Sequence, residues 1–176
     1  MGHAVEKFGR LDVMFNNAGR GHAEGLIEDL TPQMFREVTD ILLGSVVFGM
    51  KHSVPVMKRQ GSGVIINTAS IAGLGVGYGG SMYSASKAAV IHLTRVIANE
   101  VGESNIRVNA IAPGLTLVEA TAYVPEDRHQ YYLQGRAIPR PQVPEDVTAA
   151  ALFLLTRASG FITGQLLPVN GGFVLN

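Results

Sequence analysis

Hydrophobic residues along the chain gather in short runs that end in turn-forming residues. Each run is about as long as a strand, is rich in Val, Ile, Leu or Phe, and is followed by Gly, Ser or Pro-Gly; the four runs cover residues 11–19, 64–70, 106–114 and 166–172. Near-continuous apolar runs of this kind are typical of strands that are buried on both faces of a parallel sheet.

Longer segments with helical spacing separate these runs. Helices are predicted over 32–60, 82–102 and 144–156. Thr31 is suited to cap the first helix, with Pro32 at its first position, and a bend is expected near Pro55. Gly102 ends the second helix. Residues 115–143, which hold three tyrosines and several prolines, predict a short helix with loops.

The order of these elements sets the fold class. Strands that alternate with helices imply an α/β fold, in which an open parallel sheet is built with right-handed crossovers. The chain contains no internal repeat and no linker, so residues 1–176 are expected to form a single domain.

Composition removes several classes of function. Fourteen Lys and Arg balance fourteen Asp and Glu, which argues against a partner that is a nucleic acid or a membrane surface. No apolar stretch reaches the length of a membrane-spanning helix, and no signal peptide is recognised. The absence of Cys and the scattered His residues predict no metal site. A cytoplasmic location is the default expectation.

Three polar side chains suggest proton chemistry. Tyr83 and Lys87 are four residues apart on the predicted helix 82–102 and so share one face. A nearby ammonium group lowers the pKa of a phenol, which can then exchange a proton with an alcohol or ketone oxygen. Ser70 ends the preceding strand, where ligands of open α/β sheets bind. Taken alone, a Tyr–Lys pair is more often a surface pair, and a strand-end Ser often caps a turn.

Two turns at the same edge of the sheet offer room for a ligand. Asn16, Asn17, Ala18 and Gly19 end the first run with two amides and a glycine, which allow hydrogen bonds and close backbone approach. Pro113-Gly114 follows the third run in the same way. The plain alternative is an Asn-rich turn without function.

Together these motifs resemble a known family. NNAG (16–19), NTAS (67–70), YSASK (83–87), RVNAIAPG (107–114) and FITGQLLPVNGG (161–172) stand in the order and spacing of the classical short-chain dehydrogenases/reductases. The branch that is most similar is that of the 3-oxoacyl-carrier-protein reductases and secondary-alcohol dehydrogenases. The resemblance implies a Rossmann-like sheet with flanking helices, of which about four strands remain, and NAD or NADP as cofactor.

The resemblance also implies roles for individual residues. Tyr83 is then the catalytic acid/base, Ser70 polarises the carbonyl, and Lys87 lowers the pKa of Tyr83 and binds the nicotinamide ribose. Asn17, Ala18 and Gly19 then bind the cofactor on the adenosine side, and Pro113 and Gly114 lie beside the nicotinamide. The family usually has a cofactor-binding Thr at the position of Val118, and Thr116 is expected to take its place. The segment after 114 is expected to cover the substrate.

The chain departs from the family pattern at its start. Family members begin with a strand, a Gly-rich phosphate loop and a helix, and about 80 residues of that pattern are not found here. Two clusters, Gly75/Gly77/Gly80 and Gly19/Gly21/Gly25, resemble such a loop, but neither has the right context. The run 11–19 is therefore expected to expose an unpaired edge.

Smaller departures affect the site itself. The family's catalytic Asn, which holds a water in a proton relay, is replaced by Ile41 or Leu42, depending on the alignment. Asn170 stands where an Asp is usual, and we expect this change to be mild and structural.

Two hypotheses from different classes follow. The first is an NAD(P)-dependent enzyme that interconverts a small-molecule secondary alcohol and a ketone. The second is a truncated, catalytically impaired member that acts only as an interaction or subunit protein, or a non-functional fragment. The family often dimerises through the YxxxK helix and the helix before it, so a homo-oligomer, either a dimer or a tetramer, is expected.

Overall fold

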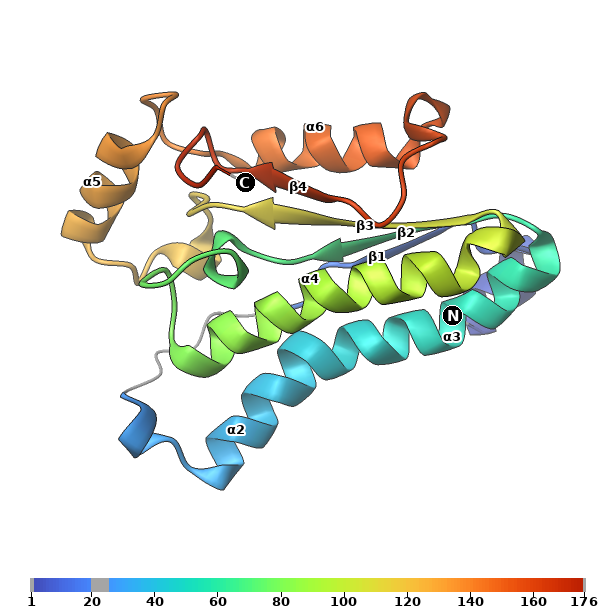
Figure 1. The fold of residues 1–176 in the computed structure, drawn as a ribbon, viewed down its shortest axis with the longest axis horizontal. Helices are drawn as coiled ribbons and strands as arrows, with labels where there is room; N and C mark the ends of the chain where they lie inside the picture. The colour runs from blue at the N-terminus through green and yellow to red at the C-terminus, as the bar shows by residue number, and fades with distance from the viewer. Residues whose placement is uncertain (1, 20–25, 176) are drawn as a thin grey trace.

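A parallel four-stranded sheet forms the centre of the molecule. The computed structural model describes residues 2–19 and 26–175. Within them the strands β1 (Val13–Asn16), β2 (Gly63–Thr68), β3 (Ile106–Pro113) and β4 (Leu166–Val169) lie in the order β1-β2-β3-β4, all parallel. All four predicted strands are therefore confirmed, and their carboxyl ends meet along one edge (Figure 1).

Helices cover both faces of the sheet. On one face lie α2 (Pro32–Thr39), α3 (Ser45–Gln60) and α4 (Ser81–Val101), and on the other lies α6 (Pro144–Leu155) (Figure 1). Two apolar clusters fill these layers: the larger joins α3 and α4 to the sheet, and the smaller joins α6 to it. The Rossmann-like α/β class is confirmed, because the central strands are buried from both sides.

The long predicted helix 32–60 is interrupted, although not where it was expected. Thr31 caps α2 by accepting a hydrogen bond from the Met34 backbone N–H at 3.2 Å, as predicted. A π-helical segment, Asp40–Gly44, then joins α2 to α3. Pro55 lies inside α3, which continues through it to Gln60. The irregularity therefore falls at Asp40–Gly44, at a distance from the proline.

The remaining elements are short. Helix α1 (Gly2–Phe8) precedes β1, and α5 (Glu126–Gly135) lies beyond the carboxyl ends of the strands (Figure 1). Single 3-10 turns complete the described chain at Ile27–Asp29, Ile71–Gly73, Gly102–Ser104, Glu119–Thr121 and Arg157–Ser159. The segment 115–143 is thus a short helix with loops, as predicted. No helix among the described residues is long and apolar enough to cross a membrane.

Strand β1 is an edge strand of the described sheet. It pairs with β2 alone, and the side chains of Val13 and Phe15 are 37% and 40% exposed. The exposed edge predicted for this run is confirmed. On its inner side β1 is fixed by a polar contact, since the Asn16 side-chain amide donates to Asn67 Oδ1 at 2.7 Å. Asn67 in turn donates to Thr94 of α4 at 3.0 Å, which ties the sheet to the helix.

Candidate active site

A cavity of about 780 Å³ opens at the carboxyl ends of β1, β2 and β3. Its walls come from these strand ends, from the loop that leads into α4, and from the segment between β3 and the middle of α5. The cavity brings together all but one of the predicted site residues: Asn17, Gly19, Ser70, Tyr83, Lys87, Pro113, Gly114 and Thr116. Ala18 is the exception, because it does not line the cavity.

Tyr83 lies in the first turn of α4, where the helix faces the end of β2. Burial raises the pKa of its phenol, and a side-chain hydrogen bond with Ser70 acts in the opposite direction. The prediction that Lys87 lowers the pKa of this phenol is wrong for the structure as it stands, because the pKa is raised and Lys87 is not among the influences on it. Gly79 allows the ring to lie against the preceding loop, since a Cβ there would be only 2.7 Å from Tyr83 Cδ1.

Ser70 is placed by the turn that follows β2. Its extended backbone ends the strand, and its hydroxyl oxygen accepts a hydrogen bond from the Ala72 backbone N–H at 3.2 Å, which caps the turn Ile71–Gly73. The capping role uses the oxygen as an acceptor, so the hydroxyl proton can still be donated to Tyr83 or to a ligand. The two predicted alternatives, a cap and a site residue, are thus compatible.

Lys87 lies one turn after Tyr83 and is 6% exposed. Its ammonium group donates to the Thr68 backbone oxygen at 2.8 Å and lies 5.8 Å from the centre of the Tyr83 ring. Burial lowers the pKa of Lys87 from 10.5 to about 8. No carboxylate among the described residues forms an ion pair with it. A buried cation with so little compensation is poised to interact with a ligand.

The end of β1 forms the neighbouring wall. Thr68 donates to Asn17 Oδ1 at 2.9 Å, which holds the Asn17 side chain at the cavity. Gly19 is close-packed: a Cβ there would be 3.3 Å from Leu42 and 3.9 Å from Lys87 Nζ. Of the two residues proposed for the missing Asn, it is Leu42 that lines the cavity, from within the π-helical segment.

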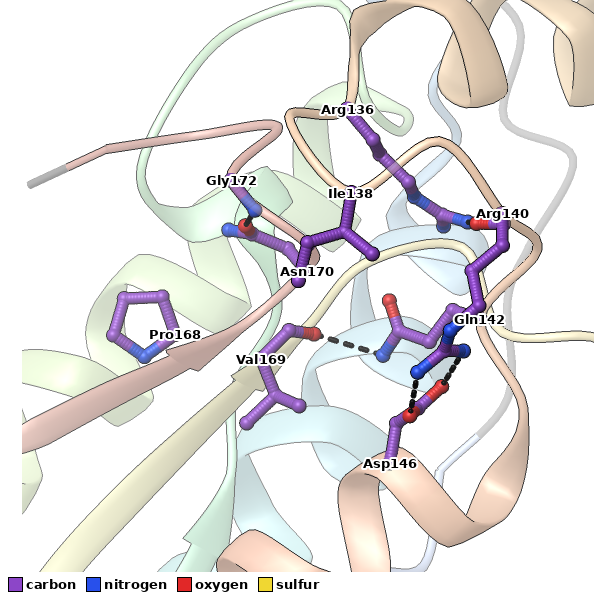
Figure 2. A pocket seen from close by; sticks show the side chains of 10 residues that line it. Arg136, Ile138, Arg140, Gln142, Asp146, Pro168, Val169, Asn170 and Gly172 are labelled. Atoms are coloured by element: carbon purple, nitrogen blue, oxygen red, sulfur yellow. Dashed lines mark hydrogen bonds and ion pairs between the residues drawn. The ribbon is translucent and has the colours of Figure 1, made fainter.

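Hydrogen bonds with residues outside the cavity lining hold the turn after β3. The Gly114 backbone N–H donates to the Val169 oxygen at 3.0 Å, and Arg136 donates to the Leu115 oxygen at 2.6 Å. Figure 2 shows how Gln142 reaches the same strand end, where its amide donates to the Val169 oxygen at 2.8 Å. These bonds fix the backbone from Gly114 to Thr116, which lines the cavity.

An ion pair and a buried Asn stabilise the segments that hold this turn. Arg140 binds the Asp146 carboxylate through two nitrogens, at 2.6 and 2.8 Å, and holds the pKa of Asp146 well below its usual range (Figure 2). Asn170 is 4% exposed and accepts from the backbone N–H groups of Gly172 and Phe173 at 2.9 and 3.0 Å. The structural role predicted for Asn170 is confirmed.

The first glycine cluster lies in the loop that leads into α4, where it was predicted. Gly75, Gly77 and Gly80 lie in the bends between β2 and α4, and Gly77 and Gly80 line the cavity. This position agrees with the prediction that they belong to the substrate-side loop. In the second cluster Gly21 and Gly25 lie outside the described residues.

Sequence reasoning missed part of the cavity wall. Tyr78 and Arg128 line it beside Tyr132, which belongs to the segment 115–143 that was expected to cover the substrate. Tyr78 and Tyr132 also pack against Phe173, with ring centres 5.3 and 4.8 Å apart. The concentration of aromatic residues in an irregular segment was the available signal. The described residues contain no group of three or more potential metal ligands.

A parallel sheet with a cavity at the carboxyl ends of its strands is the architecture of the Rossmann-like α/β enzymes. The chain matches the model of the family described as "Enoyl-(Acyl carrier protein) reductase" over residues 1–174. It is 37% identical to the 7alpha-hydroxysteroid dehydrogenase of Bacteroides fragilis, over 98% of this chain and 68% of the relative. It is 36% identical to the 3-oxoacyl-[acyl-carrier-protein] reductase FabG of Chlamydia muridarum, over 96% of this chain and 67% of the relative.

A solved structure agrees with these relatives. The structure of a 7 alpha-hydroxysteroid dehydrogenase complexed with NADH and 7-oxo glycochenodeoxycholic acid superimposes with a TM-score of 0.91 and 35% identity, covering 99% of this chain and 68% of that one. The chain belongs to the short-chain dehydrogenase/reductase family, and it spans about two thirds of the length of these relatives.

Proposed function

We propose that this protein interconverts a secondary alcohol and a ketone, with NAD or NADP as the hydride carrier. The observation that carries the proposal is the hydrogen bond between Ser70 and Tyr83, in a cavity that Lys87 also lines. These are the groups that such a reaction needs: a proton donor, a hydrogen-bond donor for the carbonyl oxygen, and a cation close to both.

In the direction of ketone reduction, Tyr83 gives its phenolic proton to the substrate oxygen as the alcohol forms. Ser70 donates a hydrogen bond to the same oxygen and stabilises the negative charge that develops there. In the direction of oxidation the phenolate accepts the proton back. A phenol whose pKa is raised by burial is a weak acid, so the charge of Lys87 has to favour the phenolate once water is excluded.

The residues present fit the nicotinamide half of a dinucleotide. Gly19 lines the cavity, and because it has no Cβ a ligand can approach its backbone closely. In this proposal Lys87 holds the nicotinamide ribose and the Pro113–Thr116 turn lies beside the nicotinamide ring, with Asn17 and Gly19 on the adenosine side. When bound, NAD or NADP accepts or supplies the hydride.

The names of the relatives, together with the cavity lining, indicate a class of substrate. The relatives include a dehydrogenase named for hydroxysteroids, and the similar solved structure is of such an enzyme complexed with 7-oxo glycochenodeoxycholic acid. The cavity here has an aromatic wall from Tyr78, Tyr123 and Tyr132. We therefore propose an alcohol or ketone on an apolar, medium-sized skeleton.

Leu42 changes the route by which protons leave the site. In the family an Asn at this place holds a water that links the Lys to solvent, and Leu42 offers neither donor nor acceptor. Lys87 instead has the Thr68 carbonyl as its hydrogen-bond partner. Proton release through Lys87 should be slower than in members with the Asn.

The experiment combines cofactor binding with turnover. The purified chain is titrated with NADH and NADPH, and oxidation of a panel of secondary alcohols is followed by cofactor absorbance. Tyr83→Phe should lower kcat roughly 100-fold or more, since general acid/base groups contribute that much, and should leave the circular dichroism spectrum unchanged. Turnover that is unaffected by Tyr83→Phe would remove the phenol from the mechanism.

The same titration tests the alternative hypothesis. Saturable dinucleotide binding supports the enzyme, whereas an intact oligomer that binds neither dinucleotide supports an interaction or subunit protein. The comparisons do not favour that alternative, because the relatives that match the chain are named as dehydrogenases and reductases.

A further inference from the structure

One cation in the cavity has no part in the proposed chemistry. Arg128 lies on α5, which faces the loop before α4 across the carboxyl ends of the strands (Figure 1). Arg128 and Lys87 are the two cationic side chains in the described lining, and no Asp or Glu lines the cavity with them. The substrate-side wall therefore carries a positive charge that nothing in the described cavity neutralises.

Contacts on several sides fix the position of Arg128. One guanidinium nitrogen donates to the Gly77 backbone oxygen at 2.7 Å. The guanidinium carbon lies 5.3 Å from the ring centre of Tyr131 and 5.6 Å from that of Tyr132, within the range of cation–π attraction. The guanidinium group is thus pre-organised, and donor N–H groups remain for a further acceptor.

The contacts of Arg128 leave its guanidinium group able to bind an anionic ligand. Both ion pairs of the described residues lie elsewhere, at Arg10–Asp12 and Arg140–Asp146. Tyr132 is 6% exposed and its pKa is raised mainly by burial, so its hydroxyl stays protonated near neutral pH. Tyr132 lines the cavity together with Arg128, so its phenolic hydroxyl can donate to the same acceptor as the guanidinium group.

We propose that Arg128 and the Tyr132 hydroxyl form a carboxylate-binding subsite, so that the substrate is an alcohol or ketone that carries a carboxylate at its other end. A guanidinium fork matches the two oxygens of a carboxylate, and a partly buried, aromatic setting strengthens such a pair. The inference rests on the proposed function for the reacting end of the substrate and adds the group that recognises the remote end.

Binding of a non-reacting probe tests the subsite without any turnover. Cyclohexanecarboxylate and cyclohexanecarboxamide have the same ring and differ in charge, and their binding to the purified chain is measured by isothermal titration calorimetry. The carboxylate should bind at least about tenfold more tightly than the amide, and this preference should weaken as salt is added. Equal affinities for the two probes would overturn the proposal.

Variants assign the effect to the two side chains. Arg128→Met should abolish the preference for the carboxylate, whereas Arg95→Met, which removes an exposed arginine outside the cavity lining, should leave it unchanged. Tyr132→Phe removes a single hydroxyl and should reduce the preference, which keeps the test valid if Arg128→Met does not fold. A preference that survives both Arg128→Met and Tyr132→Phe would contradict the subsite.

The outcome separates this subsite from the proposed reaction. Oxidation of cyclohexanol with NAD or NADP depends on Tyr83 and needs no carboxylate, whereas probe binding depends on Arg128 and needs no cofactor. Turnover without a carboxylate preference would overturn the subsite alone. A carboxylate preference without turnover of any secondary alcohol, with or without a carboxylate, would overturn the redox proposal and leave Arg128 and Tyr132 as a carboxylate-binding site only.

Discussion

At the scale of single residues, Lys87 supplies the charge that the proposed reaction needs but lowers the stability of the folded protein. It is 6% exposed, it donates a hydrogen bond to the Thr68 oxygen, and burial holds its pKa at about 8. At neutral pH the folded protein must keep a charged ammonium group where burial opposes charge. A site that needs a cation beside a phenol therefore costs the fold stability.

Replacing Lys87 with an uncharged residue should remove this loss of stability. Because the folded pKa of about 8 lies below the ordinary value of 10.5, the unfolded chain binds more protons between these pH values. The stability of the native protein should therefore rise as pH increases from about 8 toward 10.5. In Lys87→Met this rise should be lost, and the free energy of unfolding at pH 7 should increase by about 1–3 kcal/mol.

Two measurements check this prediction. Urea unfolding at several pH values gives the stability of both proteins, and turnover gives the function, which Lys87→Met should reduce roughly 100-fold. Lys58→Met, at an exposed position of α3, is the matched control and should change neither the pH dependence nor the turnover. A Lys87→Met protein with the same pH dependence as the native one would show that Lys87 is not buried in its charged form.

Residue-scale properties were also the hardest to foresee from sequence. The spacing of Tyr83 and Lys87 and the strand end at Ser70 led to the cavity, because helical periodicity and strand termination are local. The pKa of Tyr83 was expected to be lowered by Lys87, yet burial raises it. Arg128 was overlooked because its importance depends on tertiary contacts with Gly77 and Tyr132, which no local pattern encodes.

At the scale of elements, the site depends on how closely the turn after β2 packs against α4. Gly73 ends the turn Ile71–Gly73, and a Cβ there would lie 2.7 Å from the Lys87 carbonyl carbon and 2.8 Å from the Ala88 nitrogen. Both neighbours are backbone atoms of a long helix, so they cannot move aside as a side chain could. The glycine thus sets the distance between the Ser70 turn and the Tyr83–Lys87 helix.

Gly73→Ala should separate the two elements. We expect a loss of about 2–4 kcal/mol in unfolding free energy, as is usual for overpacking and strain at a close contact. Activity should fall further than stability accounts for, since the Ser70–Tyr83 hydrogen bond spans the same contact. Denaturant unfolding and turnover measure the two effects.

A second glycine provides the control. Gly61→Ala falls in the left-handed C-cap of α3, with φ 70°, and an added Cβ there would meet nothing within 4 Å. It should cost stability through backbone strain while leaving the turnover of the folded fraction intact. If Gly73→Ala and Gly61→Ala reduced stability and turnover in parallel, the turn would have no particular role in positioning the site.

The sequence pattern predicted which strands and helices form, but it did not predict their irregularities. The four strands and helices α4 and α6 were found from apolar runs, glycines and caps, because continuous burial of a parallel sheet leaves a strong local pattern. The π-helical segment Asp40–Gly44 was not predicted, because its residues have the same apolar spacing as the α-helices on either side. The proline that was expected to bend α3 is carried inside the helix.

At the scale of the whole molecule, unpartnered apolar surface suggests assembly. Phe48 on α3 is 56% exposed and Val96 on α4 is 47% exposed, although both helices bury their other faces against the sheet. The homo-oligomer that the family resemblance implies stays a prediction, in which these two helices form the contact between copies. Burial of such side chains would give the hydrophobic core that stable interfaces require.

A charge placed on this surface tests the assembly. Phe48→Glu should dissociate the oligomer, because a carboxylate buried between two copies without a partner is strongly unfavourable. The apparent dissociation constant should rise by about a hundredfold or more, as for a central interface residue. Sedimentation velocity over a range of protein concentrations measures it. Gln134→Glu adds the same charge on α5 and should leave the assembly unchanged. A native protein that sediments as a single chain, or a Phe48→Glu protein that sediments like the native one, would place the contact elsewhere or exclude it.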